Sequence, residues 1–330
     1  MKRFFFLSGL PRSGSTVLGA ILSQNPDIFV SPTSALMAAM AGAATNYAAS
    51  QATVAAPVDD QLRQVLGGVM EGMYKHAGKP VVIDKNRGWP AHVDKLREIL
   101  GQEPKIVCTV RPIAECLASF ARLIQGDLAS YVKWLMSPQG TLKGSWQTLK
   151  HGFENHRDSL LFVEYADLVN EPERQMARIY EFLGLASYRH DFGNIENAVA
   201  ERDEEAYGLP GLHTIRRKLK VSEYNAKAVL GDKLFTLYQG GEFWNDKPEP
   251  VRDKQPIDLQ LEAGLRGDFE TGWRIAKKAD PTDNRAMFNK GWYLLRQGKL
   301  LEGMKLMDQG RFEGVFGNAH PGTPRSVWDG

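Results

Sequence analysis

The strongest constraint on what this chain can fold into is a glycine-rich loop near its N-terminus. Residues 9–16 read GLPRSGST, directly after the apolar run Phe4–Leu7 and before a helical pattern that starts at Val17. Strand, glycine loop and helix in this order form an anion cradle, because the loop N–H groups turn inward and the helix N-terminus adds partial positive charge. The spacing is that of a phosphate-binding P-loop, so it predicts an anionic ligand.

The cation of this loop is not where a nucleotide triphosphatase carries it. In such an enzyme a lysine follows the second glycine and reaches the outer phosphates. Here Gly14 is followed by Ser15 and Thr16, and the basic residue is Arg12, inside the loop. A guanidinium is a planar fork that suits bidentate contact with two oxygens of one terminal group. The loop therefore predicts an anion gripped by arginine and hydroxyl groups.

Three further apolar runs have the character of buried strands. They are separated by segments with helical periodicity, such as Val93–Leu100 and Ala114–Leu123. Strands without polar alternation, separated by helices, imply a parallel sheet covered on both faces. We therefore predict a three-layer α/β domain with a central parallel sheet over residues 1–245. Its further strands are expected at Pro80–Ile83, Lys105–Val110 and Leu160–Val163.

The composition changes after Trp244. Residues 246–256 are polar and rich in proline, which is typical of a linker. Beyond them, LRGDFETGWRIAK and LRQGKLLEGMKLM share a pattern at an offset of 31 residues, with Gly267 matching Gly298 and Gly272 matching Gly303. Residues 257–330 are thus predicted to be helical, either as a tetratricopeptide-like pair of hairpins that could bind a protein partner or as a plain helical segment packed on the core.

Charge and composition exclude several classes of protein. The net charge of +2 is too small to favour nucleic acid or an anionic membrane as a partner. Two cysteines and scattered histidines indicate reduced thiols and no metal site. The apolar start is broken at Gly9, and the uncharged stretch between Asp27 and Asp59 is too polar to span a bilayer. We expect a cytoplasmic protein without an integral membrane segment.

The stretch FFFLSGLPRSGSTVLGAIL resembles the 5′-phosphosulfate-binding loop of sulfotransferases that use 3′-phosphoadenosine 5′-phosphosulfate (PAPS). It is most similar to the tyrosylprotein-sulfotransferase-like and bacterial branch. The resemblance continues in order over residues 3–245 and leaves out the tail. KIVCTVRPIAECLASF resembles the family's 3′-phosphate-binding signature, and LLFVEYADLVNEPERQMARIYEFLGL resembles its Tyr-Glu-Asp-Leu segment, with Ala166 in place of the glutamate.

The resemblance also implies the roles of individual residues. Lys85, in VVIDKNRGW, and Arg12 are expected at the transferring sulfuryl group. The cofactor would be PAPS, its product adenosine 3′,5′-bisphosphate (PAP), and no metal is expected. The residues implied to hold the cofactor are Arg12, Ser13, Gly14, Ser15, Thr16, Arg111, Ser119, Tyr165 and, in the basic stretch GLHTIRRKLK, Arg216.

The base that activates the acceptor is missing from its family position. Where the tyrosylprotein-like branch has a glutamate, IFVSPTSALM offers only hydroxyl groups and a proline. Asp84, His92 and His213 are the remaining candidates, and the sequence does not choose among them. We expect the uncharged segment Ile28–Val58 to line the acceptor pocket, which would suit a small alcohol, a lipid or a glycan.

Two other functions stay open from the residues alone. Asp84 ends an apolar run as a Walker B aspartate does, so with Thr16 it could hold magnesium in an atypical P-loop kinase or nucleotidase. The missing loop lysine counts against this hypothesis. A non-catalytic nucleotide-binding scaffold with helical repeats is the third.

Overall fold

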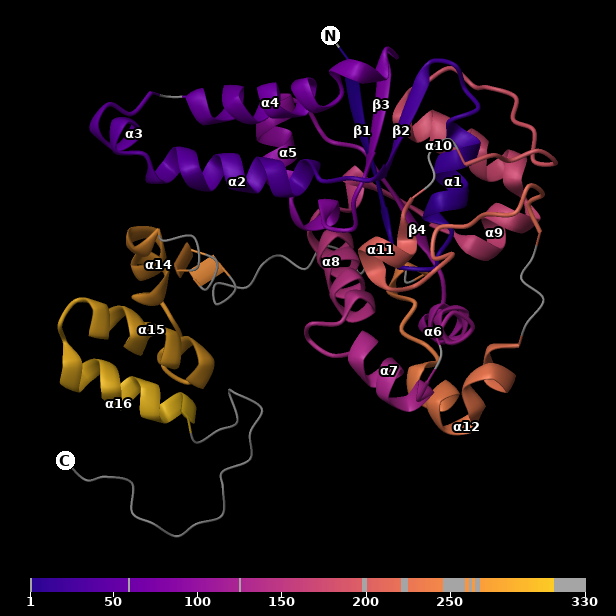
Figure 1. Ribbon diagram of the computed structural model, residues 1–330. Helices are drawn as coiled ribbons and strands as arrows, with labels where there is room; N and C mark the ends of the chain where they lie inside the picture. Colours follow the sequence, from indigo (N-terminus) through magenta and orange to yellow (C-terminus); the bar gives the residue numbers. More distant parts are fainter. Residues whose placement is uncertain are drawn as a thin grey trace. The chain divides into compact units, whose positions relative to one another are not determined.

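The computed structural model describes residues 2–58, 60–124, 126–197, 201–220, 225–245, 259–260, 263–264 and 268–311. The chain divides into two compact units, Met1–Asn245 and Asp246–Gly330. The first unit contains a parallel sheet between helices, as Figure 1 shows. The predicted linker, residues 246–256, lies outside the described residues.

The sheet has five parallel strands in the order β2-β3-β1-β4-β5. The predicted parallel sheet is therefore confirmed, and one strand was missed. This is β2, an edge strand that pairs with β3 only and whose register shifts between Val30 and Thr33, around Pro32. Proline interrupts a strand pattern, and a sheet tolerates it at an edge, where its missing N–H is not needed. The strands are β1 (Arg3–Gly9), β2 (Ile28–Thr33), β3 (Val81–Lys85), β4 (Ile106–Val110) and β5 (Leu160–Glu164).

Alternate residues of the strands build two hydrophobic cores. Phe5 and Leu7 of β1 pack under one set of helices, whereas Phe4 and Phe6 point into the opposite core. The first face is covered by α1 (Ser15–Leu22), α9 (Tyr165–Asn170) and α10 (Pro172–Leu183). The second is covered by α4 (Gln61–Met73), α5 (Val93–Leu100), α6 (Ile113–Ala121) and α8 (Thr141–Asn155).

The remaining elements of this unit surround the sheet. Helix α12 (Ala226–Tyr238) packs on α6. Apart from α2 and α3, described next, the other described elements are α7 (Leu128–Leu135), α11 (Asp203–Tyr207) and the 3₁₀ turns Lys75–Ala77, Trp89–Ala91, Arg157–Ser159 and Phe243–Asn245.

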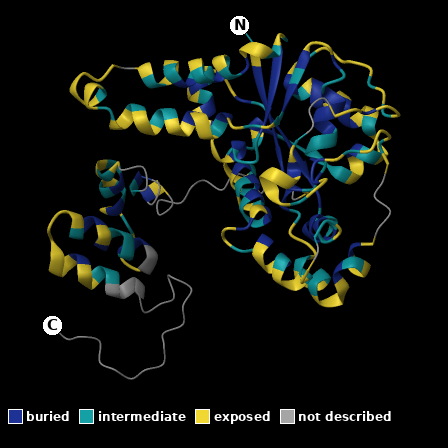
Figure 2. Cartoon of the chain, viewed as in Figure 1, coloured by how far each residue is buried: buried dark blue, intermediate teal, exposed yellow. Residues whose placement is uncertain are grey.

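The uncharged segment that we expected at an acceptor pocket is mostly an arm. Helices α2 (Leu36–Ala49) and α3 (Gln51–Ala55) run out beside α4, away from the sheet (Figure 1). The arm is largely exposed along its length, as Figure 2 shows. Its starting strand reaches a cavity at the sheet edge, where Val30, Ser31 and Pro32 lie beside Lys85.

Two neighbouring candidates on strand β3, Asp84 and Lys85, point to opposite faces of the sheet. Lys85 follows the face of Ile83, beside α1, whereas Asp84 is fully buried in the core on the opposite face. There the Asp84 carboxylate accepts hydrogen bonds from the Tyr74 hydroxyl and from Trp89 Nε1 at 2.7 Å. Asp84 is thus turned away from the P-loop, contrary to what a magnesium ligand or acceptor base requires.

The described part of the second unit contains α14 (Phe269–Ala276), α15 (Asn284–Arg296) and α16 (Leu300–Arg311). Two of the repeated glycines are close-packing points against α15. A Cβ at Gly272 would overlap Tyr293, and a Cβ at Gly303 would lie 2.8 Å from the carbonyl oxygen of Gly291. Gly298 has φ +78° in the turn between α15 and α16, and Gly267 lies outside the described residues. The tetratricopeptide likeness and a protein partner for these helices stay predictions.

Gly9 should be the least replaceable glycine of the sheet. It has φ +151°, and a Cβ there would overlap the Oγ1 and carbonyl oxygen of Thr109 on the neighbouring strand. Gly9→Ala should lower the free energy of unfolding by about 3 kcal/mol, through overpacking and backbone strain. Urea unfolding measures this. Gly144→Ala is the matched control, since its Cβ would meet no atom within 4 Å and helix α8 should gain up to about 1 kcal/mol. Equal stability of the two variants would contradict the close approach.

Asp84 should make stability fall as pH rises. Burial raises the pKa of Asp84, against hydrogen bonds from Ser34, Tyr74 and Trp89 that lower it. An unfolded aspartate titrates near ~3.9, so above that pH the folded carboxyl resists ionisation and stability is lost until its own pKa is passed. The stability of wild type relative to Asp84→Asn should therefore decline as the pH rises from about 4 toward neutral. Urea unfolding across this range tests it, with the exposed Asp27→Asn as control; a flat difference for Asp84→Asn would overturn the prediction.

Candidate active site

The P-loop is fixed by its contacts with β4. Leu10 N donates to Thr109 O at 3.0 Å, and the buried Ser13 hydroxyl contacts Leu10 O, Thr109 O and Thr109 Oγ1 at 2.6, 2.9 and 2.7 Å. The Ser13 side chain therefore anchors the loop from behind and does not face a ligand. Arg12 has φ +67°, an uncommon backbone conformation for a residue other than glycine. The tight turn directs the residues after Ser13 toward the front of the loop.

Gly14 ends the loop and leads into α1. Its φ is +96°, and a Cβ there would lie 2.7 Å from Cδ2 of Tyr165, so only glycine allows this ring to sit on the loop. The N-terminal N–H groups of a helix lack partners within the helix and attract anions. Here that end of α1 carries Ser15 and Thr16, which line the cavity in front of it.

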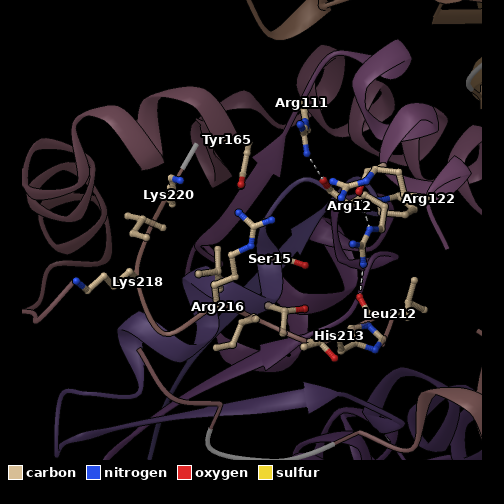
Figure 3. Close-up of a pocket in the computed structure, with 18 of the residues that line it drawn as sticks. Arg12, Ser15, Arg111, Arg122, Tyr165, Leu212, His213, Arg216, Lys218 and Lys220 are labelled. Carbon is tan, nitrogen blue, oxygen red and sulfur yellow. Dashed lines mark hydrogen bonds between the residues drawn. The ribbon is translucent and has the colours of Figure 1, made fainter. Parts of the chain in front are cut away.

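The cavity has a volume of about 210 Å³ and an unusual concentration of positive charge (Figure 3). No carboxylate is among the described residues that line it. Such a surface is suited to a ligand with several anionic groups, because charge-assisted hydrogen bonds hold phosphate and sulfate oxygens strongly. Its basic residues are Arg12, Arg87, Arg111, Arg122, Arg216, Lys218 and Lys220.

Four candidates from three separate segments meet in this cavity. Arg12 Nε donates to Ser119 Oγ at 3.0 Å, and Arg12 Nη1 donates to the carbonyl of Leu212. Arg111 Nη1 lies 3.4 Å from the carbonyl oxygen of Arg12, and its guanidinium carbon is 4.4 Å from the centre of the Tyr165 ring. The structure thus brings the loop cation, the end of β4, helix α6 and the end of β5 to one place.

Lys85 lies on the other side of the loop, at a smaller cavity of about 20 Å³. Ser15 and Thr16 line both cavities, so they stand between Lys85 and the basic group described above. Lys85 Nζ contacts Glu201 Oε1 at 3.1 Å. Burial lowers the pKa of Lys85, while the neighbouring Glu201 opposes that shift. An ammonium held beside the N-terminus of α1 can neutralise charge on a group transferred there.

His213 is part of a buried pair with Asp203. Its Nδ1 lies 2.5 Å from Asp203 Oδ1, and its backbone N–H donates to Asp203 Oδ2 at 2.7 Å. The same Nδ1 is 3.5 Å from Glu201 Oε2, and His213 also lines the basic cavity (Figure 3). His92, in contrast, is an exposed residue at the start of α5, outside both cavities.

Several lining residues were missed by sequence reasoning. Arg87 follows Lys85 by two residues and Arg122 lies one helical turn beyond Ser119, so proximity to known candidates could have suggested both. Lys218 and Lys220 belong to the basic stretch that yielded Arg216. Glu201 had no signal, because it stands in the charged run ERDEE, which is typical of an exposed helix start.

In the described part of the chain, every helix is too short or too polar to span a bilayer. The same residues contain no group of three His, Cys, Asp or Glu side chains that could hold a metal ion. The cytoplasmic location stays a prediction.

Solved structures with a similar course of the chain are remote in sequence. The sulfotransferase domain of the Synechococcus PCC 7002 olefin synthase is 19% identical, with a TM-score of 0.43 over 81% of this chain and 94% of that one. A mouse sulfotransferase complexed with PAP is 17% identical, with a TM-score of 0.40, 72% of this chain covered and 84% of the other. A sulfotransferase from Alicyclobacillus acidocaldarius is 14% identical, with a TM-score of 0.39, 64% and 88% being covered.

A search of curated proteins finds no match. The model of the sulfotransferase family, in contrast, matches residues 5–189, which is more than half of the chain. The matched region runs from β1 past α10 and includes the P-loop, Lys85, Arg111 and Tyr165. The chain belongs to the sulfotransferase family, whose members transfer a sulfuryl group.

Proposed function

We propose that this protein transfers the sulfuryl group of PAPS to a hydroxyl or amine of an acceptor without the help of a metal ion. The observation that carries the proposal is the basic cavity in front of a P-loop whose own cation is Arg12. PAPS carries a 3′-phosphate and a 5′-phosphosulfate, so it needs cations at two places. Arg111 and Arg12 on one side of Ser15, and Lys85 on the other, supply them.

The 5′-phosphosulfate would occupy the front of the P-loop. Ser15 and Thr16 start α1 and offer their backbone N–H groups and hydroxyls to it. Arg111 and Ser119 would hold the 3′-phosphate, with the Arg12 side chain beside them. Tyr165 covers Gly14 and carries the Arg111 guanidinium on its face, so its ring would lie between the two anionic groups.

The residues present suit an in-line displacement at sulfur. The acceptor atom attacks as the bond from sulfur to the 5′-phosphate oxygen breaks, and the electron pair of that bond stays on the phosphate. Negative charge then spreads over the equatorial sulfuryl oxygens and grows on the leaving phosphate, where Lys85 and Arg12 can stabilise it. A sulfuryl group carries less negative charge than a phosphoryl group, so protein cations can take the place that magnesium has in a kinase.

The acceptor is proposed to be a small alcohol, a lipid or a glycan. The cavity beside Lys85 is lined by Val30, Ser31 and Pro32, a weakly polar wall. A transfer assay with labelled PAPS over small alcohols, lipids and glycans would identify the class.

Nucleotide stabilisation of the folded protein tests the cofactor directly. A ligand that binds only the folded state raises the Tm, by an amount that corresponds to ~2.7 kcal/mol at a hundredfold excess over its Kd. PAPS and PAP should raise the Tm. EDTA should leave that shift unchanged, because Arg12, Lys85 and Arg111 neutralise the anionic groups in place of a metal ion. ATP that stabilises only with magnesium would favour the kinase hypothesis. No shift from PAPS, PAP, ATP or GTP would favour a scaffold.

Arg111 and Ser119 should set the preference for a 3′-phosphorylated nucleotide. Removing a hydrogen bond to a charged group costs about 1.5–3 kcal/mol, so Arg111→Ala should reduce the ratio of PAP to adenosine 5′-monophosphate affinity by about 10- to 100-fold. Ser119→Ala should reduce it less. Titration calorimetry gives both affinities. Ser145→Ala on α8, whose hydroxyl bonds Thr141 O in its own helix, is the control. A ratio that stays at the wild-type value in Arg111→Ala would show that the 3′-phosphate lies elsewhere.

A further inference from the structure

Glu201 is a largely buried carboxylate in contact with the residue proposed to meet the sulfuryl group. Its side chain is 10% exposed, and Oε1 lies 3.1 Å from Lys85 Nζ. Oε2 accepts a hydrogen bond from Thr33 N at 3.4 Å and lies 3.5 Å from His213 Nδ1. These contacts fix the carboxylate within a few ångströms of the place where Lys85 would neutralise a sulfuryl oxygen.

Glu201 also stands where two cavities meet. It lines the small cavity that contains Ser15, Thr16 and Lys85, and it lines a wider one of about 520 Å³ formed by the segment that follows it. Among the described residues, Glu201 is the one common to both linings. An acceptor that enters through the wider cavity therefore meets this carboxylate just before it reaches Lys85. The other residues lining the wider cavity are Arg202, Asp203, Glu204, Glu205, Pro210, Gly211 and Thr214.

The other candidates for an acceptor base are less well placed. Asp84 is buried against Tyr74 and Trp89 on the opposite face of the sheet, and His92 is exposed at α5. His213 directs Nδ1 to Asp203, and Asp203 uses both of its oxygens on His213. His213 lines the basic cavity and not the small cavity that contains Lys85, so Glu201 is the carboxylate in contact with Lys85.

We infer that Glu201 is the catalytic base that accepts the proton of the acceptor group. This inference rests on the proposed function. The acceptor hydroxyl passes its proton to a carboxylate oxygen of Glu201 as its oxygen forms the bond to sulfur and the bond from sulfur to the 5′-phosphate oxygen breaks. The products are a sulfate ester, PAP and protonated Glu201, which then releases its proton to water. Lys85 stays protonated throughout.

The surrounding charges suit this role. Burial tends to raise the pKa of Glu201, but Lys85, the hydrogen bond from Thr33 and His213 outweigh it and hold the pKa below its usual value. Glu201 is thus ionised and ready as a base at neutral pH. Arg87 adds positive charge and Asp203 negative charge nearby. Once a sulfuryl oxygen shares the Lys85 ammonium, the carboxylate loses part of its counter-ion and becomes a stronger base.

In this position Glu201 competes with the sulfuryl group for contact with Lys85. Two negative groups beside one ammonium repel each other. This repulsion acts on PAPS through its sulfuryl group. It does not act in this way on PAP, which lacks that group. Loss of the Glu201 charge should therefore increase the affinity for PAPS more than the affinity for PAP. Loss of a merely structural residue would not produce this change.

Three variants and two measurements test the inference. Glu201→Gln removes the base, Glu201→Asp retains a carboxylate, and Glu196→Gln is the control, because it removes an exposed carboxylate paired with Arg217 in the same part of the chain. The first measurement is PAP release from PAPS between pH 4 and pH 9, with water and with the alcohols of the acceptor panel. The second is titration calorimetry with PAPS and with PAP.

Glu201→Gln should lower kcat by about 100-fold or more and abolish the fall in rate on the acid side of the pH profile. Glu201→Asp should restore part of the rate, and Glu196→Gln should behave as wild type. The ratio of PAPS to PAP affinity should rise about fivefold in Glu201→Gln, because like charges a few ångströms apart repel even in a high dielectric.

The outcomes separate this inference from the proposed function. Wild-type protein that binds neither PAPS nor PAP would contradict the proposed function itself. If wild-type protein binds PAPS but Glu201→Gln leaves both the pH profile and the ratio of PAPS to PAP affinity unchanged, Glu201 is not the base. The proposed cofactor would then still stand. If no acceptor in the panel supports measurable turnover, an unchanged affinity ratio alone overturns it.

Discussion

Repulsion among like charges is the constraint around which this site is built. A cavity that binds a polyanion contains several cations, and each cation needs a partner within the protein when no ligand is bound. The structure shows how: Arg111 Nε pairs with Glu115 at 2.9 Å, Lys85 pairs with Glu201, and Arg12 donates to a hydroxyl and a backbone carbonyl. A buried charge without a partner is strongly destabilising. The partners of these cations are therefore part of the binding site, since a ligand must take over or share their contacts.

The parallel sheet is what brings these cations together. All five strands end at the same edge, and β1, with the P-loop at its end, lies between β3 and β4. Lys85 ends β3, and Arg111 follows β4. Crevices at such a switch point are the usual ligand sites of open α/β sheets. This arrangement could be predicted from the sequence, because it needs only the apolar runs, the helical segments between them and the glycine loop.

Features that depend on register or on distant contacts could not be predicted in the same way. Asp84 and Lys85 are neighbours in an apolar strand that is buried on both faces, so no polar alternation shows which one points to α1. Strand β2 was hidden by Pro32, which an edge position tolerates. Glu201 reaches Lys85 across 116 positions of the chain, a pairing that no local pattern encodes. The predictable parts are local, and the missed ones are set by packing.

The segment that contains Glu201 connects the two halves of the proposed reaction. At its start, Glu201 and Asp203 lie on the acceptor side, and at its end Arg216, Lys218 and Lys220 line the basic cavity. Backbone hydrogen bonds from Ile195 to Arg217 and from Leu219 to Phe192 hold this end against the body of the unit. In between, the carbonyl of Leu212 accepts from Arg12 of the P-loop. The carboxylate beside Lys85 and three cations of the basic cavity thus belong to one stretch of chain, which the P-loop contacts through Arg12.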